Sequence, residues 1–392
     1  MKISNFVLIN INRMKKIQMV DLVSQYEKIK PAIDSAIMEV LQSAQFINGA
    51  EVVGFQTELE LYLGVKHVIP CANGTDALQI SMMALGLKPG DEVITPSFTY
   101  IATTEVIALL GLKPVFVEVN QETFCMDSCK LEAAITSRTK AIVPVHLYGQ
   151  AADMNAIMAI AKKHNLFVIE DNAQAIGSDY HLLDGSLVKT GTIGDIGCTS
   201  FFPSKNLGCY GDGGAICTND DLLAEKLRMI ANHGQSKRYY HDVVGCNSRL
   251  DNIQAAVLRI KLRQLDNYIN SRREVADFYD AFFATIEGVK TPFRADDSKH
   301  VFHQYTLTLE EYNRDGLNEF LASKNIPSMI YYPVPAHRQK MFEEFGSSST
   351  DLPVTDWLTH RVISLPIHTE MDIEQLELIT KTVSEYLTMK SN

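Results

Sequence analysis

The sequence predicts an α/β fold: a mainly parallel, seven-stranded sheet sandwiched by helices, followed by a smaller C-terminal α+β unit. Two observations lead to this prediction. Between residues 66 and 219, short apolar runs rich in β-branched and aromatic residues alternate with amphipathic stretches of helical period. After residue 245 that alternation stops, and apolar residues recur at helical spacing over a long stretch. Continuous apolar strands with helices between them are typical of a parallel sheet covered on both faces.

The elements follow in order along the chain. Seven expected strands share an apolar interior bounded by Gly, Pro or Asp: 66–72, 92–97, 113–119, 141–149, 166–171, 196–202 and 214–219. Four helices are expected between or after them: 75–86, 99–110, 153–164 and 220–232. The apolar spacing from 247 to 286 predicts one long connecting helix. The remainder predicts a strand in "QYTLTL" and helices near 314–324 and 372–387.

These elements divide the chain into three expected parts. Residues 1–20 form an N-terminal tail, 21–265 the large α/β domain with the start of the connecting helix, and 266–392 the small domain.

Composition excludes several classes of protein. The 392 residues are 46% hydrophobic and 21% charged, an ordinary balance for a globular chain. A net charge of −11 argues against a nucleic-acid partner, which needs a dense positive face. We expect no membrane span and no signal peptide, because no apolar run reaches ~18 residues and no small-residue cleavage site is present. The seven cysteines include no CxxC pair, which indicates reduced thiols in a cytoplasmic protein without a metal site.

Candidate functional residues stand where the predicted strands end, because ligands of parallel sheets gather at the carboxyl ends of strands. Gly74 and Thr75 open a helix directly after the first strand. Their N–H groups suit a phosphate, although Asn, Thr and Asp are also ordinary cap residues. Phe98 and Tyr100 follow the second strand. Either belongs to the core or stacks on a flat ligand.

The fourth and fifth strands end in further polar groups. His146 is interpreted as a core histidine with its hydrogen bonds satisfied. Glu170 and Asp171 end an apolar strand, and Gln174 follows. A buried carboxylate needs a cation or donor, which is either a salt-bridge partner or a protonated ring nitrogen.

A single lysine follows the sixth strand in "FFPSKNLGCYGDGG". Burial of Lys205 among these apolar residues would lower the pKa of its amine and make it a nucleophile. The glycines would let the chain turn tightly around it. A phosphate cradle, an aromatic plane, a carboxylate, a glutamine and a lysine on one sheet edge match pyridoxal 5'-phosphate, whose aldehyde condenses with lysine.

The order of these motifs resembles a known family. "NGTDAL", "PSFTYIAT", "EDNAQAIG", "SFFPSKNLG", "GCNSRLD" and "YYPVPAH" follow one another as in the DegT/StrS sugar aminotransferases, and the likeness extends from about Asp21 to the C-terminal helix. The resemblance implies the fold of type I pyridoxal-phosphate enzymes. Within the family, the chain is most similar to enzymes that aminate UDP-2-acetamido-2-deoxy-3-oxo-D-glucuronate.

The resemblance also implies roles for residues around the cofactor. Lys205 would form the Schiff base and later move a proton. Asp171 would pair with the ring nitrogen, and Gln174 would meet the phenolic oxygen. Gly74, Thr75 and Ser200 would hold the phosphate, and Tyr100 would stack on the ring.

Other implied roles concern the substrate and a second subunit. In a homodimer with shared sites, Asn247 would reach the partner's phosphate and Arg249 the acidic groups of the substrate. Tyr331 and Tyr332 would contact the substrate. Several relatives have a histidine where Tyr331 stands, so the fine substrate class does not follow from this motif.

The expected function is transfer of an amino group, from L-glutamate, to a nucleotide-linked keto-sugar for surface polysaccharide such as lipopolysaccharide O-antigen. A different UDP- or dTDP-linked 3-keto or 4-keto sugar is an alternative substrate. A sugar dehydratase of this family would carry histidine in place of Lys205. A non-catalytic regulatory relative would be free to lose both Lys205 and Asp171, and both are present.

Overall fold

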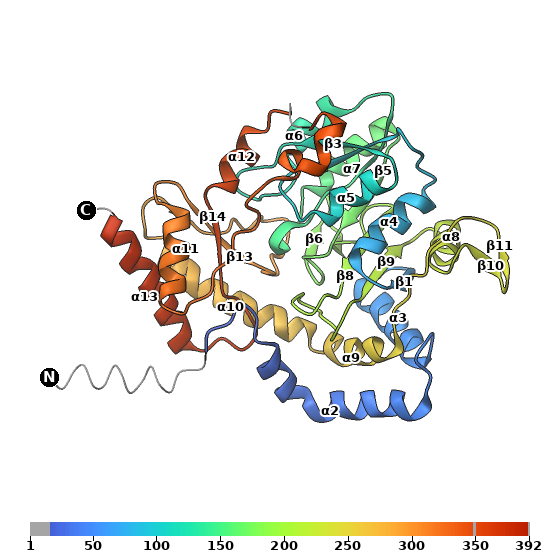
Figure 1. Cartoon of the computed structure of the whole chain (residues 1–392), viewed down its shortest axis with the longest axis horizontal. Coiled ribbons are helices and arrows are strands. Elements are labelled where there is room, and N and C mark those ends of the chain that lie inside the picture. Colours follow the sequence, from blue (N-terminus) through green and yellow to red (C-terminus); the bar gives the residue numbers. More distant parts are fainter. Residues whose placement is uncertain (1–15, 348–349, 391–392) are drawn as a thin grey trace.

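The computed structural model describes residues 16–347 and 350–390, and a seven-stranded sheet lies at its centre (Figure 1). The strands lie in the order β1-β9-β8-β5-β4-β2-β3. Their bounds are β1 (His67–Cys71), β2 (Glu92–Pro96), β3 (Lys113–Val117), β4 (Thr139–Ile142), β5 (Phe167–Asp171), β8 (Ile196–Ser200) and β9 (Gly214–Thr218). Strand β9 is antiparallel to both of its neighbours, whereas the pairs from β8 to β3 are parallel. The predicted mainly parallel sheet is confirmed.

Helices cover both faces of this sheet, and alternate strand residues show which face each helix covers. Ile69, Val93 and Ile169 pack with α4 (Gly74–Ala84), α5 (Ala102–Leu109) and α8 (Asp221–Ala231). Val68 and Val168 point to the other face, where α3 (Ala50–Leu63), α7 (Met154–His164) and α9 (Asn252–Leu262) lie. The two faces are therefore both buried, as the unbroken apolar strands predict.

Strand β4 is shorter than the predicted segment 141–149. Pro144 has no N–H to give to a ladder, so the regular pairing is interrupted there, although Val145 still forms a parallel bridge with Asp171 before the chain leaves the sheet. The 3-10 turn η2 (Leu147–Gly149) follows, with Tyr148 in a left-handed conformation at φ 58°.

The predicted connecting helix is two helices, α9 and α10 (Leu265–Phe283). Helix α9 packs on the large sheet, and α10 spans both cores, because its residues Leu265 and Ile269 still belong to the core of the large sheet. Leu258 and Leu262 pack in the core of the large sheet, whereas Tyr279 and Phe283 pack in the core of the C-terminal part. Helix α2 (Leu22–Ser43) precedes α3 and lies beside α9 (Figure 1).

The C-terminal part is built on a small antiparallel sheet of order β12-β13-β14. Its elements are β12 (Val289–Lys290), β13 (Tyr305–Leu309), α11 (Arg314–Ser323), β14 (Val362–Leu365) and α13 (Ile373–Lys390). Ile17 is buried in the same core. Residues 1–15 of the predicted tail lie outside the described residues.

Between β13 and β14 the chain returns to the large sheet. Phe342 packs on Phe116 of β3, and Tyr331, Tyr332 and Leu358 belong to the core around β2 and β4. The short elements here are η3 (Ala336–Arg338), η4 (Lys340–Phe345) and α12 (Pro353–Thr359). This return brings Tyr331 and Tyr332 to the carboxyl edge of the seven-stranded sheet.

The remaining short elements lie in connections. They are α6 (Ser128–Leu131), η1 (Glu132–Ala134), the β6 (Asp179–His181)–β7 (Leu187–Lys189) hairpin and the β10 (Gln235–Lys237)–β11 (Tyr240–His241) hairpin. The last of these projects from the body of the molecule beside α8 (Figure 1).

Candidate active site

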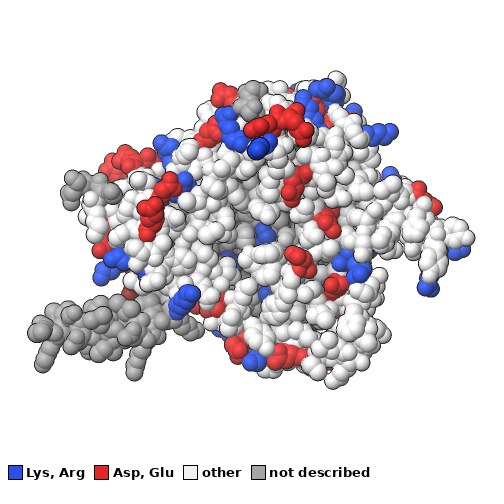
Figure 2. All heavy atoms as spheres, viewed as in Figure 1, with Lys and Arg blue, Asp and Glu red and all other residues white. Residues whose placement is uncertain are grey.

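The carboxyl ends of the central strands meet at a cavity of about 770 Å³. The predicted site residues that line it are Gly74, Thr75, Tyr100, Asp171, Gln174, Ser200, Lys205, Tyr331 and Tyr332. Figure 2 shows that this view of the molecule is hollowed near its centre, with Lys or Arg atoms inside the hollow. The structure thus brings together nine of the predicted residues from five separate segments of the chain.

Lys205 stands on a tight turn after β8. Its N–H donates to the carbonyl of Phe202 at 2.8 Å. Gly208 approaches Pro203 so closely that a Cβ there would lie 2.3 Å from the Pro203 carbonyl oxygen, so a glycine is required. Asn206 anchors the turn by donating to the Val301 carbonyl at 2.9 Å.

The amine of Lys205 has the electrostatics of a nucleophile. Burial lowers its pKa to about 8, and the nearby Asp171 carboxylate opposes this shift only in part. A larger fraction of the amine is therefore neutral near pH 8 than for an exposed lysine.

Asp171 and Glu170 are neighbours with different surroundings. Asp171 is 5% exposed and lines the cavity, and its carboxylate accepts from Thr103 Oγ1 at 2.7 Å and from the Ala173 N–H at 3.1 Å. Thr103 was not among the predicted residues. These two donors orient the carboxylate and leave it capacity for a cationic N–H from a ligand.

Glu170 points away from the cavity and is fully buried. Its carboxylate accepts from the N–H groups of Gly191, Ile193 and Gly194 at 2.6–2.7 Å and faces His146 Nε2 at 2.9 Å. His146 Nδ1 accepts from the Ala152 N–H at 3.1 Å. The interpretation of His146 as a satisfied core histidine is confirmed, and Glu170 joins it in a structural network.

The start of α4 forms one end of the cavity. The Asn73 side chain caps the helix by accepting from the Asp76 N–H at 2.8 Å. The N–H groups of Gly74 and Thr75 belong to the first helical turn, which has no partners within the helix. A Cβ on Gly74 would lie 2.7 Å from Ser200 Cβ, so these two residues form a close concave surface suited to an anion.

Aromatic side chains form the opposite side. Tyr100 is 57% exposed, and its ring lies 6.2 Å from that of Tyr332. Gln174 Nε2 donates to the Tyr332 hydroxyl at 3.2 Å, and Gln174 Oε1 accepts from the Tyr148 N–H at 2.8 Å. Phe98 is completely buried, so of the two aromatics after β2 it is Phe98 that belongs to the core.

Two predicted residues do not line this cavity. Asn247 is exposed and forms an isolated bridge with Asn232. Arg249 forms an ion pair with Asp251 at 2.9 Å. The cavity also contains residues that sequence reasoning missed, among them His303 and Gln304. The only sequence signal for these was a histidine two residues before the apolar run of β13.

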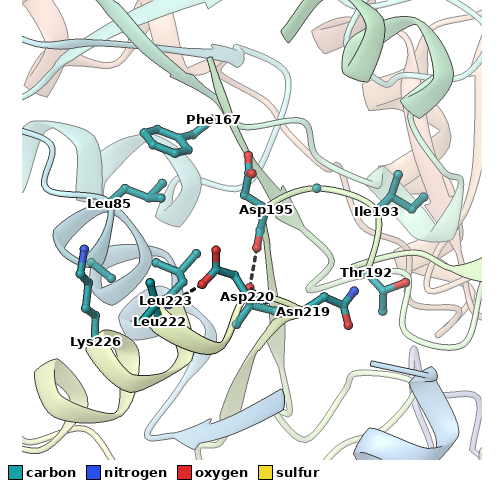
Figure 3. A pocket seen from close by; sticks show the side chains of 13 residues that line it. Leu85, Phe167, Thr192, Ile193, Asp195, Asn219, Asp220, Leu222, Leu223 and Lys226 are labelled. Atoms are coloured by element: carbon teal, nitrogen blue, oxygen red, sulfur yellow. Dashed lines mark hydrogen bonds between the residues drawn. The ribbon is translucent and has the colours of Figure 1, made fainter. Parts of the chain in front are cut away.

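A second hollow lies at the opposite, amino edge of the sheet (Figure 3). Its volume is about 660 Å³, and it is lined by Phe167, Asp195, Asp220 and Lys226 among others. Its two acids accept hydrogen bonds from the backbone. Asp195 accepts from the Val168 N–H at 2.7 Å, and Asp220 caps α8 by accepting from the Leu223 N–H at 2.8 Å.

The carboxyl-edge cavity fits pyridoxal phosphate group by group. The Gly74–Ser200 surface suits the phosphate, Tyr100 the ring face, Asp171 the ring nitrogen and Lys205 the aldehyde. Among the described residues, no group of His, Cys, Asp and Glu could hold a metal ion. In the same residues, no helix has the length and apolar character to cross a membrane.

Comparison with known proteins gives a consistent result. The model of the DegT/DnrJ/EryC1/StrS aminotransferase family matches residues 27–384. The chain is 47% identical to a Pseudomonas aeruginosa UDP-2-acetamido-2-deoxy-3-oxo-D-glucuronate aminotransferase, over 93% of this chain and 98% of that protein. It is 45% identical to an Acidithiobacillus ferrooxidans UDP-N-acetyl-3-dehydro-alpha-D-glucosamine 3-aminotransferase, over 95% of this chain and 98% of that one. A Geobacillus stearothermophilus protein named pleiotropic regulatory protein is 46% identical, over 94% and 98%.

Solved structures agree. An S. venezuelae enzyme, DesV, in complex with a ketimine intermediate is 39% identical, with a TM-score of 0.90 over 95% of this chain and 99% of that chain. A Bacillus subtilis protein, NtdA, with bound cofactor PMP is 31% identical, with a TM-score of 0.88 over 96% and 86%.

Proposed function

The chain belongs to the DegT/DnrJ/EryC1/StrS aminotransferase family, and we propose that it aminates UDP-2-acetamido-2-deoxy-3-oxo-D-glucuronate with L-glutamate as the amino donor. It is a pyridoxal-phosphate-dependent sugar aminotransferase with the fold of type I pyridoxal-phosphate enzymes. The observation that carries the transaminase chemistry is the amine of Lys205, which lines the cavity where the strand ends meet and whose pKa burial lowers to about 8. The product would enter surface polysaccharide biosynthesis.

Bound pyridoxal phosphate supplies an electron-accepting ring and an aldehyde carbon that carries the amino group between the two substrates. The chain would hold this group at both ends. The first turn of α4 and Ser200 would bind the phosphate, and the negative charge of Asp171 would keep the ring nitrogen protonated. Thr103 would orient Asp171 through its 2.7 Å hydrogen bond.

Lys205 would act as the base at the reacting carbon. Its Nζ has a lowered pKa, so it accepts and returns a proton near neutral pH without a large energetic penalty. Gln174 would use the amide N–H that is not bonded to Tyr332 to reach the phenolic oxygen. Tyr332 stays protonated, because burial raises its pKa far above the ordinary value.

The substrate proposal is supported by the two relatives named for UDP-linked 3-keto sugars, at 45% and 47% identity. Another relative, at 39% identity, is named for a dTDP-linked sugar. The test is to incubate the enzyme and glutamate with a panel of UDP- and dTDP-linked keto-sugars and to identify the product by mass and NMR. We expect amination of the UDP-3-keto glucuronate, and preference for a dTDP-sugar would contradict the proposal.

The glucuronate carboxylate needs a cation that the described lining of the cavity does not supply beyond Lys205. We propose that the enzyme is a homodimer in which Arg249 of the second subunit binds this carboxylate and Asn247 the phosphate. Lys205→Ala and Arg249→Ala homodimers should each be nearly inactive. Each mixed dimer should regain up to about half of the activity of a wild-type dimer, because one of its two sites then carries neither change. Mixed dimers that stay inactive would contradict shared sites.

The regulatory name of one relative gives a second candidate, a regulator without catalysis. Such a protein would not need a lysine of lowered pKa opposite a buried carboxylate. Measuring the visible absorbance of the protein with pyridoxal phosphate, and its loss on addition of glutamate, separates the two candidates.

A further inference from the structure

His303 is a buried histidine of the cavity that no role above has used. It is 6% exposed and lines the cavity beside Lys205, Gln304 and Tyr331. Its Nδ1 is buried and has no hydrogen-bond partner. Because buried polar atoms are nearly always paired, the unpartnered Nδ1 limits the protonation state and tautomer that the His303 ring can adopt.

The segment that carries His303 is fixed on several sides. The Val301 N–H donates to the Gly149 carbonyl at 2.9 Å, and Arg272 donates to the carbonyl of Phe302 at 3.2 Å. Phe302 stacks on His300 with ring centroids 3.9 Å apart. The turn of Lys205 is tied to the same segment, through Asn206 and the Val301 carbonyl. The ring of His303 therefore has a defined position relative to Lys205.

The charge and tautomer of His303 follow from these surroundings. Burial, followed by the positive charges of Lys205 and Arg272, holds the pKa of His303 well below its ordinary value, so the ring is neutral. A proton on Nδ1 would be a buried donor without an acceptor, which is more costly than a bare acceptor there. The proton therefore belongs on Nε2, the nitrogen left to face the cavity.

We propose that His303 is a specificity-determining residue whose Nε2–H donates a hydrogen bond to a neutral oxygen of the keto-sugar, next to the carbon that is aminated. This inference depends on the proposed function in that the acceptor substrate is a sugar. The oxygen is a hydroxyl or carbonyl on the neighbouring ring carbon.

The charges of the cavity favour the sugar over the amino donor as the partner of His303. The donor's carboxylates bind best to cations, and a neutral imidazole gives them only a weak contact. Lys205 is the only lysine or arginine among the described residues that line the cavity, and the acids there are Asp76, Asp171 and Asp212. A neutral hydrogen-bond donor in this position suits the uncharged oxygens of the sugar ring.

Two substitutions separate the nitrogens of the ring. The amide nitrogen of Gln lies near the place of Nε2, whereas that of Asn lies near Nδ1. His303→Asn should slow the half-reaction with the keto-sugar by about 10-fold to 100-fold, because an oxygen of the bound sugar loses its donor. His303→Gln should stay within about fivefold of wild type. Both variants should keep the half-reaction with glutamate within about threefold, followed by the absorbance of the cofactor.

The matched control is His300→Asn in the same segment. His300 is buried and accepts from the Phe302 N–H through Nδ1 at 3.0 Å, and it does not line the cavity. The Asn amide oxygen preserves this acceptor but the ring that stacks on Phe302 is lost, so any effect of loosening the segment should be within about threefold and equal in both half-reactions. Equal loss in His303→Gln and His303→Asn, or equal loss in the two half-reactions, would overturn the proposal.

A measurement on the unmutated holoenzyme does not require that any variant folds. In protein labelled with ¹⁵N-histidine, the resonances of His303 should report a neutral ring protonated on Nε2 between about pH 6 and pH 8. An Nδ1–H tautomer, or titration near pH 6.5, would overturn the proposal. The kinetics use whichever keto-sugar the wild-type enzyme aminates. If that sugar is not the one proposed above, the substrate panel shows it, and the test of His303 still stands.

Discussion

The two edges of the seven-stranded sheet carry hollows of similar size, about 770 Å³ at the carboxyl edge and 660 Å³ at the amino edge. They differ in what their polar groups do. At the amino edge, Asp220 caps α8, and the Thr218 hydroxyl donates to the Asp195 carbonyl at 2.8 Å. At the carboxyl edge, Lys205, Asp171 and His303 are wholly or partly buried and face the cavity.

This comparison teaches that volume does not identify the site. Buried polar groups that the fold itself does not satisfy are costly unless a ligand meets them. Lys261 adds a further distinction. Burial lowers its pKa to about 8 as well, but it is 1% exposed and lies over the ring of Tyr210 at 5.2 Å. A lowered pKa therefore marks a site only where a cavity gives access to the amine.

The two edges should respond very differently when the lysine at each of them is replaced. Lys205→Ala should reduce kcat by at least ~10³-fold, because no other lysine lines the cavity among the residues that the structure describes. Lys226→Ala at the amino edge should leave kcat unchanged. Steady-state transamination assays of both variants, with circular dichroism to verify folding, test this. Comparable losses in the two variants would show that the edges do not differ as described.

Asp171→Asn should have the next largest effect. An amide cannot hold the ring nitrogen protonated by charge, so kcat should fall by roughly 10²-fold to 10³-fold, and the cofactor should bind more weakly. Equilibrium titration of the apoenzyme with pyridoxal phosphate measures the second effect. A variant with unchanged turnover and unchanged affinity would make Asp171 a structural residue.

Glu170→Gln tests whether the two neighbouring carboxylates have different roles. The Gln amide nitrogen would face N–H donors where Glu170 now accepts from Gly191, Ile193 and Gly194. We expect a loss of about 2–4 kcal/mol in the free energy of unfolding, measured by denaturant titration. The turnover of the folded fraction should stay close to wild type, in contrast to Asp171→Asn.

The pH dependence of cofactor capture should show the smallest of these effects. A lowered lysine pKa makes the neutral amine more abundant as pH rises through the folded pKa, here about 8. The rate at which apoenzyme takes up pyridoxal phosphate should rise about tenfold from pH 7 to pH 9 and then level off. A rate that keeps rising toward pH 10 would indicate an ordinary, solvated lysine.

Much of this arrangement is predictable from the sequence, because strand ends in a parallel sheet meet at one edge. That rule places Lys205, Asp171 and the start of α4 together without any knowledge of side-chain contacts. The seven strands are likewise marked by their apolar runs. The end of β4 is an exception, because Pro144 interrupts the regular ladder inside an apolar run that continues beyond it.

Other features depend on contacts between distant segments, which spacing does not encode. Glu170 and Asp171 look alike in the sequence. The backbone N–H groups of residues 191–194 bind the carboxylate of Glu170, which leaves Asp171 as the acid that faces the cavity. Thr103 and His303 reach the site through α5 and through the segment before β13. The break between α9 and α10 falls at residues 263–264, where no Gly or Pro marks it in the sequence.

The most direct test of the central claim is to find which lysine holds the cofactor. The holoenzyme is reduced with borohydride, digested, and its peptides are mapped by mass spectrometry. We predict pyridoxyl phosphate on Lys205 and none on Lys226 or Lys261, since of these three lysines only Lys205 combines a lowered pKa with access to the cavity. Cofactor fixed to another lysine, or an active enzyme in which none is fixed, would contradict the account.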